Sequence, residues 1–395
     1  MDVLISGAGV AGPCLAWWLL ENGHRVTIVE RAASPRTGGY IVDFWGQGYD
    51  IAERMGILPR LLDAGYRLDE LRLVDADGQR QSGVRGKAFL SVTDGRFISL
   101  PRGELSLALV DVVKDRARMQ FADSIAAIRQ DAQGVDVTFE HAPSRRFDLV
   151  VGCEGLHSRT RDLAFGPREA FERYLGYQFA AWIMPDYPHR DEDAYLAYGE
   201  PGRTAARFTL RDGTSLALFL WRDAEGEPIP HEEAGQRALL RRRFAGMAWE
   251  AAEMLAALDG ARDLYLDRIA QIRMDRWHKG RVALLGDAAF GPSFLAGQGA
   301  ALAMIGAYVL AGELRRAETV EAALSAYHAR LAGFMKAKQD AALPIGRAFV
   351  PETPFGIRFR AAVGRLMNVG WIAKAAFGRT LTDRIDLPDY PTGAG

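Results

Sequence analysis

Two groups of glycine and acidic residues, nearly three hundred positions apart, could together bind a dinucleotide. Glycines let a backbone approach a phosphate closely, and a carboxylate can accept hydrogen bonds from sugar hydroxyls. The two groups are Gly7, Gly9 and Gly12 with Glu30, and Gly286-Asp287-Ala288-Ala289 with Gly297-Gln298-Gly299.

The first group has the spacing Gly-x-Gly-x-x-Gly. Gly7 allows a tight turn, Gly9 lets the backbone approach a pyrophosphate, and Gly12 lets a helix pack on a strand. Glu30 is placed to accept hydrogen bonds from a ribose diol, and its charge would repel a 2′-phosphate. The group indicates FAD or NAD, not NADP, but does not separate the first two.

The second group indicates an extended cofactor. Asp287 follows a buried strand and could bind a ribityl or phosphate-adjacent hydroxyl. Gly297-Gln298-Gly299 opens a helix, whose backbone N–H groups could face an anion, such as the N1–C2=O region of a reduced flavin. Arg102, at the start of another predicted helix, could bridge to a phosphate or to the flavin, or lie in solvent.

The elements that must position these residues follow the pattern of an α/β fold. Apolar runs at 3–6 and 282–285 are typical of buried parallel strands, and 25–30 is a strand that ends in an acid. Residues 11–22 and 299–314 are predicted as helices. The late strand would bring its acid back beside the first glycine turn.

The middle of the chain has a different pattern. Alternation predicts strands and a hairpin turn at 211–213, and then a long helical stretch at 232–258. A separate sheet with its own helices is therefore inserted into the nucleotide domain. The predicted strands are 71–74, 91–100, 135–139, 147–152, 178–184, 194–198, 205–210 and 215–221.

Composition narrows the function. The 395 residues are enough for two domains, and 49% hydrophobic with 25% charged residues is the balance of a soluble globular protein. A net charge of −1 gives no reason to expect nucleic acid as a partner. The two cysteines and seven scattered histidines suggest no metal site. We see no export signal and expect a cytoplasmic protein.

With a third motif between the two groups, from Asp148 to Arg161, the chain resembles the class A FAD-dependent monooxygenases. This p-hydroxybenzoate-hydroxylase-like family includes aromatic hydroxylases and tetracycline-inactivating enzymes. The resemblance covers about residues 1–330. It implies a Rossmann-like FAD-binding domain at 1–68, 98–166 and 276–335, a mostly antiparallel substrate domain at 69–97 and 167–275, and a C-terminal helical segment at 336–395.

The resemblance also implies a mechanism and site residues. NADH or NADPH reduces FAD, O2 adds to the flavin, and a C4a-hydroperoxide hydroxylates an aromatic or polycyclic small molecule. Glu30 would hold the adenosine ribose, Arg102 would lie near the flavin, and Asp287 near the pyrophosphate and ribityl chain. The full predicted cofactor set is Gly7, Gly9, Ala11, Gly12, Glu30, Arg31, Arg102, Asp287, Gly297, Gln298 and Gly299.

Four positions depart from the family pattern. Glu154 replaces the usual Asp of the middle motif, which puts pyridine-nucleotide use in question. Phe290 replaces a common His, Phe294 stands where Pro is usual with Pro292 displaced, and Ala301 replaces a frequent Asn. We interpret these changes as the mark of a subfamily.

Substrate contacts are expected from the inserted sheet and from the turn after Asp287. The histidine of the middle motif, His157, is interpreted as a residue that stabilises its loop and not as an acid or base. Because side chains alternate along a strand, about half of the sheet candidates should face away from the substrate. The candidates are Gln178, Trp182, Phe208, Phe219, Trp221, Phe290, Pro292 and Phe294.

Three alternatives remain beside this interpretation. The protein could be a flavin-dependent dehydrogenase or a non-catalytic flavin sensor, whereas a halogenase is disfavoured because Trp-x-Trp-x-Ile-Pro is absent.

The third alternative concerns the C-terminal segment. Residues 345–380 carry six basic residues and one acid, so this segment could lie on a membrane or a partner. We prefer a helix packed across both domains. Its predicted apolar face is Ile357, Val363, Leu366, Met367, Gly370 and Phe377.

Overall fold

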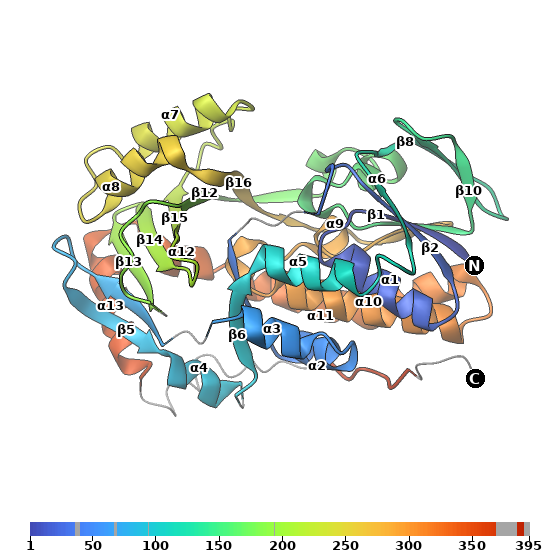
Figure 1. Cartoon of the computed structure of the whole chain (residues 1–395), viewed down its shortest axis with the longest axis horizontal. Helices are drawn as coiled ribbons and strands as arrows, with labels where there is room; N and C mark the ends of the chain where they lie inside the picture. The colour runs from blue at the N-terminus through green and yellow to red at the C-terminus, as the bar shows by residue number, and fades with distance from the viewer. Residues whose placement is uncertain (36–39, 67–68, 94, 193, 369–384, 391–395) are drawn as a thin grey trace.

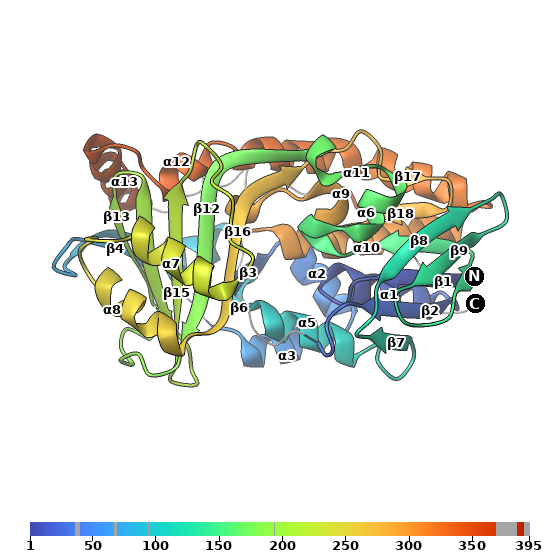
Figure 2. The same ribbon diagram turned by 90° about the horizontal axis from the view of Figure 1, so that it is seen from above.

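The protein has two lobes, seen side by side in Figures 1 and 2. This computed structural model describes residues 1–35, 40–66, 69–93, 95–192, 194–368 and 385–390. Gly370 and Phe377, which belong to the apolar face predicted for the C-terminal helix, lie outside the described residues.

The nucleotide lobe is built on a six-stranded sheet that is parallel except at β17. The strand β1 lies at its centre, between β11 and β2, because a run of Val, Leu and Ile with both faces covered suits a central parallel strand. In sheet order the strands are β17 (His278–Lys279), β18 (Val282–Leu284), β11 (Leu149–Gly152), β1 (Asp2–Ser6), β2 (Arg25–Glu30) and β7 (Arg118–Phe121).

Helices enclose this sheet and form the largest core of the molecule with it. The long helix α10 is buried along nearly its whole length and packs on α1, α2 and α11. The helices of this lobe are α1 (Ala11–Glu21), α2 (Gln47–Arg54), α3 (Leu58–Ala64), α5 (Arg102–Asp111), α6 (Arg159–Ala164), α9 (Asp287–Phe290), α10 (Gly299–Arg316) and α11 (Val320–Ala342).

Two small antiparallel sheets complete this lobe. One consists of β8 (Ile125–Gln130), β9 (Val135–Phe139) and β10 (Arg145–Phe147), and the other of β3 (Ile41–Trp45) and β6 (Phe97–Pro101). The pair β3–β6 lies between the nucleotide sheet and the second lobe, so its residues can take part in a site shared by both.

The second lobe is a seven-stranded sheet, antiparallel except where β13 meets β4. Both of its faces are buried: one packs on α7 and α8, and the other faces the nucleotide lobe. In order the strands are β16 (Arg262–Ile272), β12 (Glu172–Met184), β15 (Ser215–Arg222), β14 (Arg203–Thr209), β13 (Ala194–Glu200), β4 (Glu70–Val74) and β5 (Arg80–Arg85). The helices are α4 (Gly86–Val92), α7 (Glu233–Arg243), α8 (Ala251–Ala256), α12 (Ile345–Phe349) and α13 (Pro354–Leu366).

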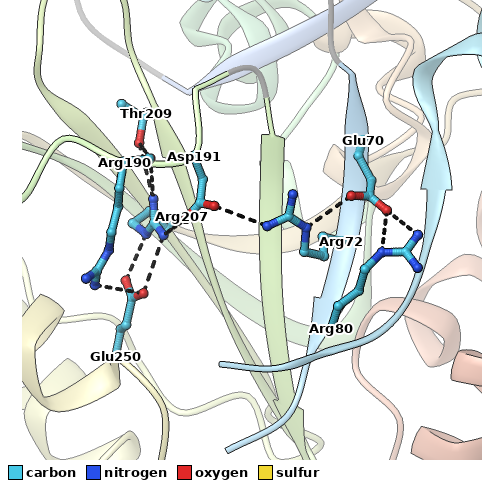
Figure 3. Close-up of polar contacts among 8 residues, drawn as sticks. All are labelled: Glu70, Arg72, Arg80, Arg190, Asp191, Arg207, Thr209 and Glu250. Atoms are coloured by element: carbon cyan, nitrogen blue, oxygen red, sulfur yellow. Dashed lines mark hydrogen bonds and ion pairs between the residues drawn. The ribbon is translucent and has the colours of Figure 1, made fainter. Parts of the chain in front are cut away.

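A buried cation ties the strands of this lobe together (Figure 3). The guanidinium of Arg207, with a fully buried side chain, donates to Glu250 at 2.8 Å and to Asp191 at 2.8 Å. Asp191 also accepts from Arg72, which pairs with Glu70 at 3.0 Å. A buried charge is tolerated only when it is paired in this way. The network joins β14, the start of α8 and β4 on the side of the sheet that faces α7 and α8, and so supports the lobe structurally.

The prediction of the fold class as α/β with an inserted, mostly antiparallel sheet is confirmed. Two element predictions were wrong. Residues 91 and 92 belong to α4, which is closed by a bond from the Gly95 N–H to Leu90 O at 2.8 Å, and the strand begins only at Phe97. The helical stretch at 232–258 is two helices, interrupted by Trp249 with φ +58°. Strands β5, β7, β8 and β16 were missed.

The proposed domain limits stay our interpretation, with one change. Residues 69–97 supply β4 and β5 to the same sheet as 167–275, as that division required. The limit at residue 335 falls inside α11, because this helix runs unbroken to Ala342, so the C-terminal segment is better started after it.

Candidate cofactor and substrate site

The first glycine turn has the geometry that a bound pyrophosphate needs. Gly7 has φ +108°, and a Cβ there would lie 2.7 Å from the carbonyl oxygen of Cys153. A Cβ on Gly12 would lie 2.0 Å from the carbonyl oxygen of Gly7. Neither position can hold a side chain, so α1 begins directly against the turn. The N-terminus of α1 has no side-chain cap, which leaves its N–H groups available to an anion.

Glu30 lies at the end of β2, beside this turn. Its two carboxylate oxygens accept the backbone N–H groups of Ala8 at 2.8 Å and Ala32 at 2.9 Å. Each oxygen keeps a lone pair, so the oriented carboxylate fits a ribose diol. Arg31 follows it with an exposed side chain, and its role stays a prediction.

The second group converges on the first. A Cβ on Gly9 would lie 3.8 Å from the Arg102 guanidinium, and a Cβ on Gly299 would lie 3.6 Å from the carboxylate of Asp287. Ala11 lies between the groups, because a Cβ on Gly286 would lie 3.2 Å from its Cβ. Loops from four distant parts of the chain therefore meet in one place, as the sequence predicted.

Two groups of opposite charge, Asp287 and Arg102, lie near each other at this place. Asp287 is exposed, yet the surrounding protein desolvates its carboxyl and raises its pKa, while Arg102 acts in the opposite direction. Burial also raises the pKa of the Tyr40 hydroxyl. The charge of Arg102 lowers this pKa and the charge of Asp287 raises it. A cation and a hydroxyl-accepting carboxylate side by side suit the phosphate and ribityl parts of FAD. The residues present therefore fit this cofactor.

Gly297 adopts the left-handed conformation, with φ +64°, and starts the turn into α10. A Cβ there would lie 3.6 Å from the Trp45 ring on β3. Ser293 in the preceding turn has φ +93°, a conformation that a non-glycine residue rarely adopts. Backbone strain of this kind is common at functional sites, and here it lies in the segment that departs from the family pattern.

The departures at Ala301 and Glu154 have local causes. A Cβ on Gly48 of α2 would lie 2.6 Å from the Cβ of Ala301, so the close packing of α2 on α10 leaves no room for Asn. The Glu154 carboxylate accepts the Ser158 hydroxyl at 2.6 Å and the Thr160 N–H at 3.1 Å. It is used inside the chain to hold the start of α6.

The middle motif is linked to both lobes. Arg161, fully buried, donates to the carbonyl oxygens of Leu156 at 2.8 Å and Ala288 at 3.2 Å, which fixes the motif against α9. His157 contacts Asp267 of β16 at 3.0 Å and Arg168 at 2.6 Å. These contacts agree with its interpretation as a loop-stabilising residue.

Most of the predicted substrate residues do not lie at this site, which corrects our expectation. Gln178, Trp182, Phe219 and Trp221 point to the sheet face covered by α7 and α8, where Gln178 donates to Asp223 at 2.7 Å and the three aromatic residues form core. Phe290 is buried in the nucleotide lobe, with its ring centroid 4.7 Å from that of Trp277.

Phe208 and Phe294 do lie on the side of the sheet that faces the nucleotide lobe. Phe294 stacks on Phe179 of β12 with ring centroids 4.2 Å apart, and Tyr40 meets both rings edge-on. Pro292 is buried in the same turn, where its carbonyl oxygen accepts from the Gln271 amide at 3.0 Å, so it contributes backbone. We name Tyr40, Phe179, Tyr265 and Phe294 the aromatic cluster.

Sequence reasoning missed Tyr40, Phe179, Tyr265 and a carboxyl group, Asp43. The Asp43 carboxylate on β3 accepts a hydrogen bond from the buried Ser99 hydroxyl at 2.6 Å. Burial raises the pKa of Asp43, and the charge of Asp43 contributes to a raised pKa of the Tyr195 hydroxyl on β13. The sequence feature that could have pointed to Asp43 is a single acidic residue within an otherwise apolar strand. In the part of the chain that the structure describes, no group of three or more His, Cys, Asp or Glu could hold a metal ion.

Comparison with known proteins agrees with this site. Residues 1–342 match the family described as FAD binding domain. A flavin-dependent monooxygenase from an unknown prokaryotic organism is 32% identical over 391 residues, which cover 98% of each chain. An uncharacterized protein of Mycobacterium tuberculosis is 38% identical over 344 residues, covering 85% of this chain and 91% of the other.

Among solved structures, the tetracycline destructase Tet(51) superposes with a TM-score of 0.82 at 29% identity, covering 98% of this chain and 99% of the other. The chain belongs to the FAD-binding, class A flavin-dependent monooxygenases. It is an FAD-dependent oxidoreductase that acts with O2 on a small-molecule substrate.

Proposed function

We propose that this enzyme uses NADPH or NADH as reductant to hydroxylate a polycyclic aromatic small molecule in the cytoplasm. The observation that carries the proposal is the aromatic cluster. Phe294, seven residues after Asp287, stacks on Phe179 of the sheet, so the cofactor side and the sheet share one aromatic surface. Flat aromatic substrates bind to such surfaces by stacking.

The electrostatics support the same location. The backbone N–H of Arg102 donates to the carbonyl oxygen of Tyr40 at 3.0 Å, and the charges of Arg102 and Asp287 both affect the pKa of the Tyr40 hydroxyl. The cluster therefore lies beside the group of residues assigned to FAD. The likeness to Tet(51) supports a polycyclic substrate, because that protein is named a tetracycline destructase.

The chain's residues have supporting roles in this reaction. Bound FAD would accept a hydride from NAD(P)H and deliver one oxygen atom of O2 to the substrate, with the other released as water. Gly297 to Gly299 would donate backbone hydrogen bonds, Arg102 and Asp287 would hold the cofactor, and the aromatic cluster would exclude water and orient the ring to be hydroxylated.

The test is oxidation of NADPH and NADH by the purified holoprotein, with tetracycline and a panel of polycyclic phenols as probes. We expect a probe to stimulate flavin reduction, and the product to carry one oxygen from isotopically labelled O2. Reduction without oxygen transfer would favour the dehydrogenase alternative. A flavin that neither pyridine nucleotide reduces, with every probe present, would favour the sensor and overturn the proposal.

A further inference from the structure

Exposed apolar side chains are concentrated in one short part of the chain. Of the eight large hydrophobic residues that are exposed among the described residues, five lie between 349 and 366. Four of them form one line on α13, which we name the apolar stripe: Phe355, Phe359, Val363 and Leu366, exposed by 75%, 61%, 37% and 54%. Their spacing of four, four and three places them on one helix face. The rings of Phe355 and Phe359 stack with centroids 6.3 Å apart.

The opposite face of α13 is fixed to the sheet, which turns the stripe outward. Gly364 packs on β5, where a Cβ would lie 3.2 Å from the Ser82 hydroxyl. Arg365 donates two bonds to the carbonyl oxygen of Gln81, at 3.0 and 3.1 Å. Figures 1 and 2 both place α13 at the end of the molecule opposite β1 and β2. The stripe is thus a rigid feature at one extremity.

The charged residues of α13 and its flanks have one sign. The chain as a whole carries 49 basic and 50 acidic residues, yet residues 353–368 contain three basic residues and no acid. Arg358 and Arg365 are exposed on α13, and Arg85 is exposed on the neighbouring strand β5. The nearest acid in sequence, Glu352, is paired with Arg222 at 2.6 Å.

We propose that the apolar stripe docks on the surface of an anionic lipid bilayer. Aromatic side chains on one helix face enter the boundary between headgroups and acyl chains, and arginines beside them bind lipid phosphates. A second copy of this chain fits the stripe less well, because a two-fold interface would bring the positively charged residues of both copies close together, where they would repel each other.

The helix would lie on the bilayer and not cross it. Its 13 residues span about 20 Å, less than the hydrocarbon core of a membrane. None of the helices in the described ranges has the length and hydropathy of a membrane-spanning segment.

The test is flotation of the full-length FAD-loaded protein with phosphatidylglycerol vesicles, compared with phosphatidylcholine vesicles. We expect binding to the anionic vesicles that weakens as salt is raised. Replacing both Phe355 and Phe359 by Ser should reduce the affinity about tenfold or more, because two exposed rings are lost from the docked face. Arg358→Gln should reduce it about fivefold.

The matched control is Leu62→Ser. Leu62 is similarly exposed, at 48%, but lies on α3 of the nucleotide lobe, so its loss should leave flotation unchanged. Flavin content and the melting temperature confirm that each variant is folded. Equal flotation of wild type and the double variant, or no flotation of wild type, overturns the proposal. A dimer in light scattering that the double variant dissociates, without vesicle binding, would instead assign the stripe to contact between copies.

Discussion

At the scale of single residues, the unusual group is Asp43, an acid on β3 three residues after Tyr40 of the aromatic cluster. Its carboxyl is desolvated, which raises its pKa, and it accepts a hydrogen bond from the Ser99 hydroxyl. Proteins rarely keep such an acid unless it binds something. We interpret Asp43 as the acceptor for a hydroxyl or amino group of the substrate, next to the ring of Tyr195.

We expect Asp43→Asn to be more stable than wild type at neutral pH. The folded state binds the Asp43 proton more tightly than the unfolded state, so ionisation of this carboxyl destabilises the fold once the pH exceeds its raised pKa. Asn does not ionise and can still accept the Ser99 hydroxyl. The gain in melting temperature should therefore be full at neutral pH and shrink as the pH falls through the raised pKa.

The same variant tests the role in recognition. If a substrate hydrogen bond to the carboxylate is lost, the KM of a stimulating probe should rise about tenfold, since hydrogen bonds to charged groups contribute about 1.5–3 kcal/mol. An unchanged KM together with the stability gain would make Asp43 a strained core residue with no part in binding.

At the scale of elements, the strands of the second lobe explain which predictions failed. In β12, Gln178 and Trp182 point to one face while Tyr177 and Phe179 point to the other, and both faces carry aromatic residues and are buried. The alternation of residue types predicts that successive side chains point to opposite faces of the sheet. It does not predict which of the two sets faces the cofactor. That depends on α7 and α8 covering one face, which is a tertiary contact.

The glycine turns could be predicted because their chemistry is local. Glycine is required at Gly7, Gly12 and Gly297 because φ is positive or because a Cβ would lie within 3 Å of another atom. Such positions can be recognised in the sequence because only glycine fits them. Tyr265 could not be found in this way, because it reaches the aromatic cluster from β16, an edge strand whose residues 262–272 mix polar and apolar types without clean alternation.

The two faces of this sheet can be separated by one matched pair of substitutions. Phe179→Leu and Phe219→Leu make the same change at two buried positions, and each should cost about 1 kcal/mol of unfolding free energy. Only Phe179 stacks on Phe294, so only its variant should raise the KM of a stimulating probe, by about three- to tenfold. Denaturant unfolding and NADPH oxidation measure the two effects. Equal kinetic effects at both positions would mean that the aromatic cluster does not contact substrate.

At the scale of the whole molecule, the C-terminal part of the chain connects the two lobes. Helix α13 is fixed to β5 of the sheet, whereas residues 385–390 lie on α2 and α10 of the nucleotide lobe. Gln47 exchanges two hydrogen bonds with the backbone of Ile385, at 2.7 and 2.9 Å, and Tyr308 donates to the carbonyl oxygen of Pro388 at 2.8 Å. If the proposed bilayer docking occurs, it would bring the sheet lobe to a surface where polycyclic molecules accumulate.

Tyr390 is the principal anchor of this connection, and its removal tests how far the connection stabilises the fold. The ring is 5% exposed and packs so closely on α10 that a Cβ on Gly312 would lie 2.3 Å from it, and its hydroxyl donates to Glu313. Tyr390→Ala should cost about 3–5 kcal/mol and lower the melting temperature, because a buried aromatic side chain is lost. Phe355→Ala, which removes an exposed ring from the same part of the chain, should change stability by less than about 0.5 kcal/mol. Equal melting temperatures for both variants would show that residues 385–390 add nothing to stability, and that the other contacts between the lobes are enough to hold them together.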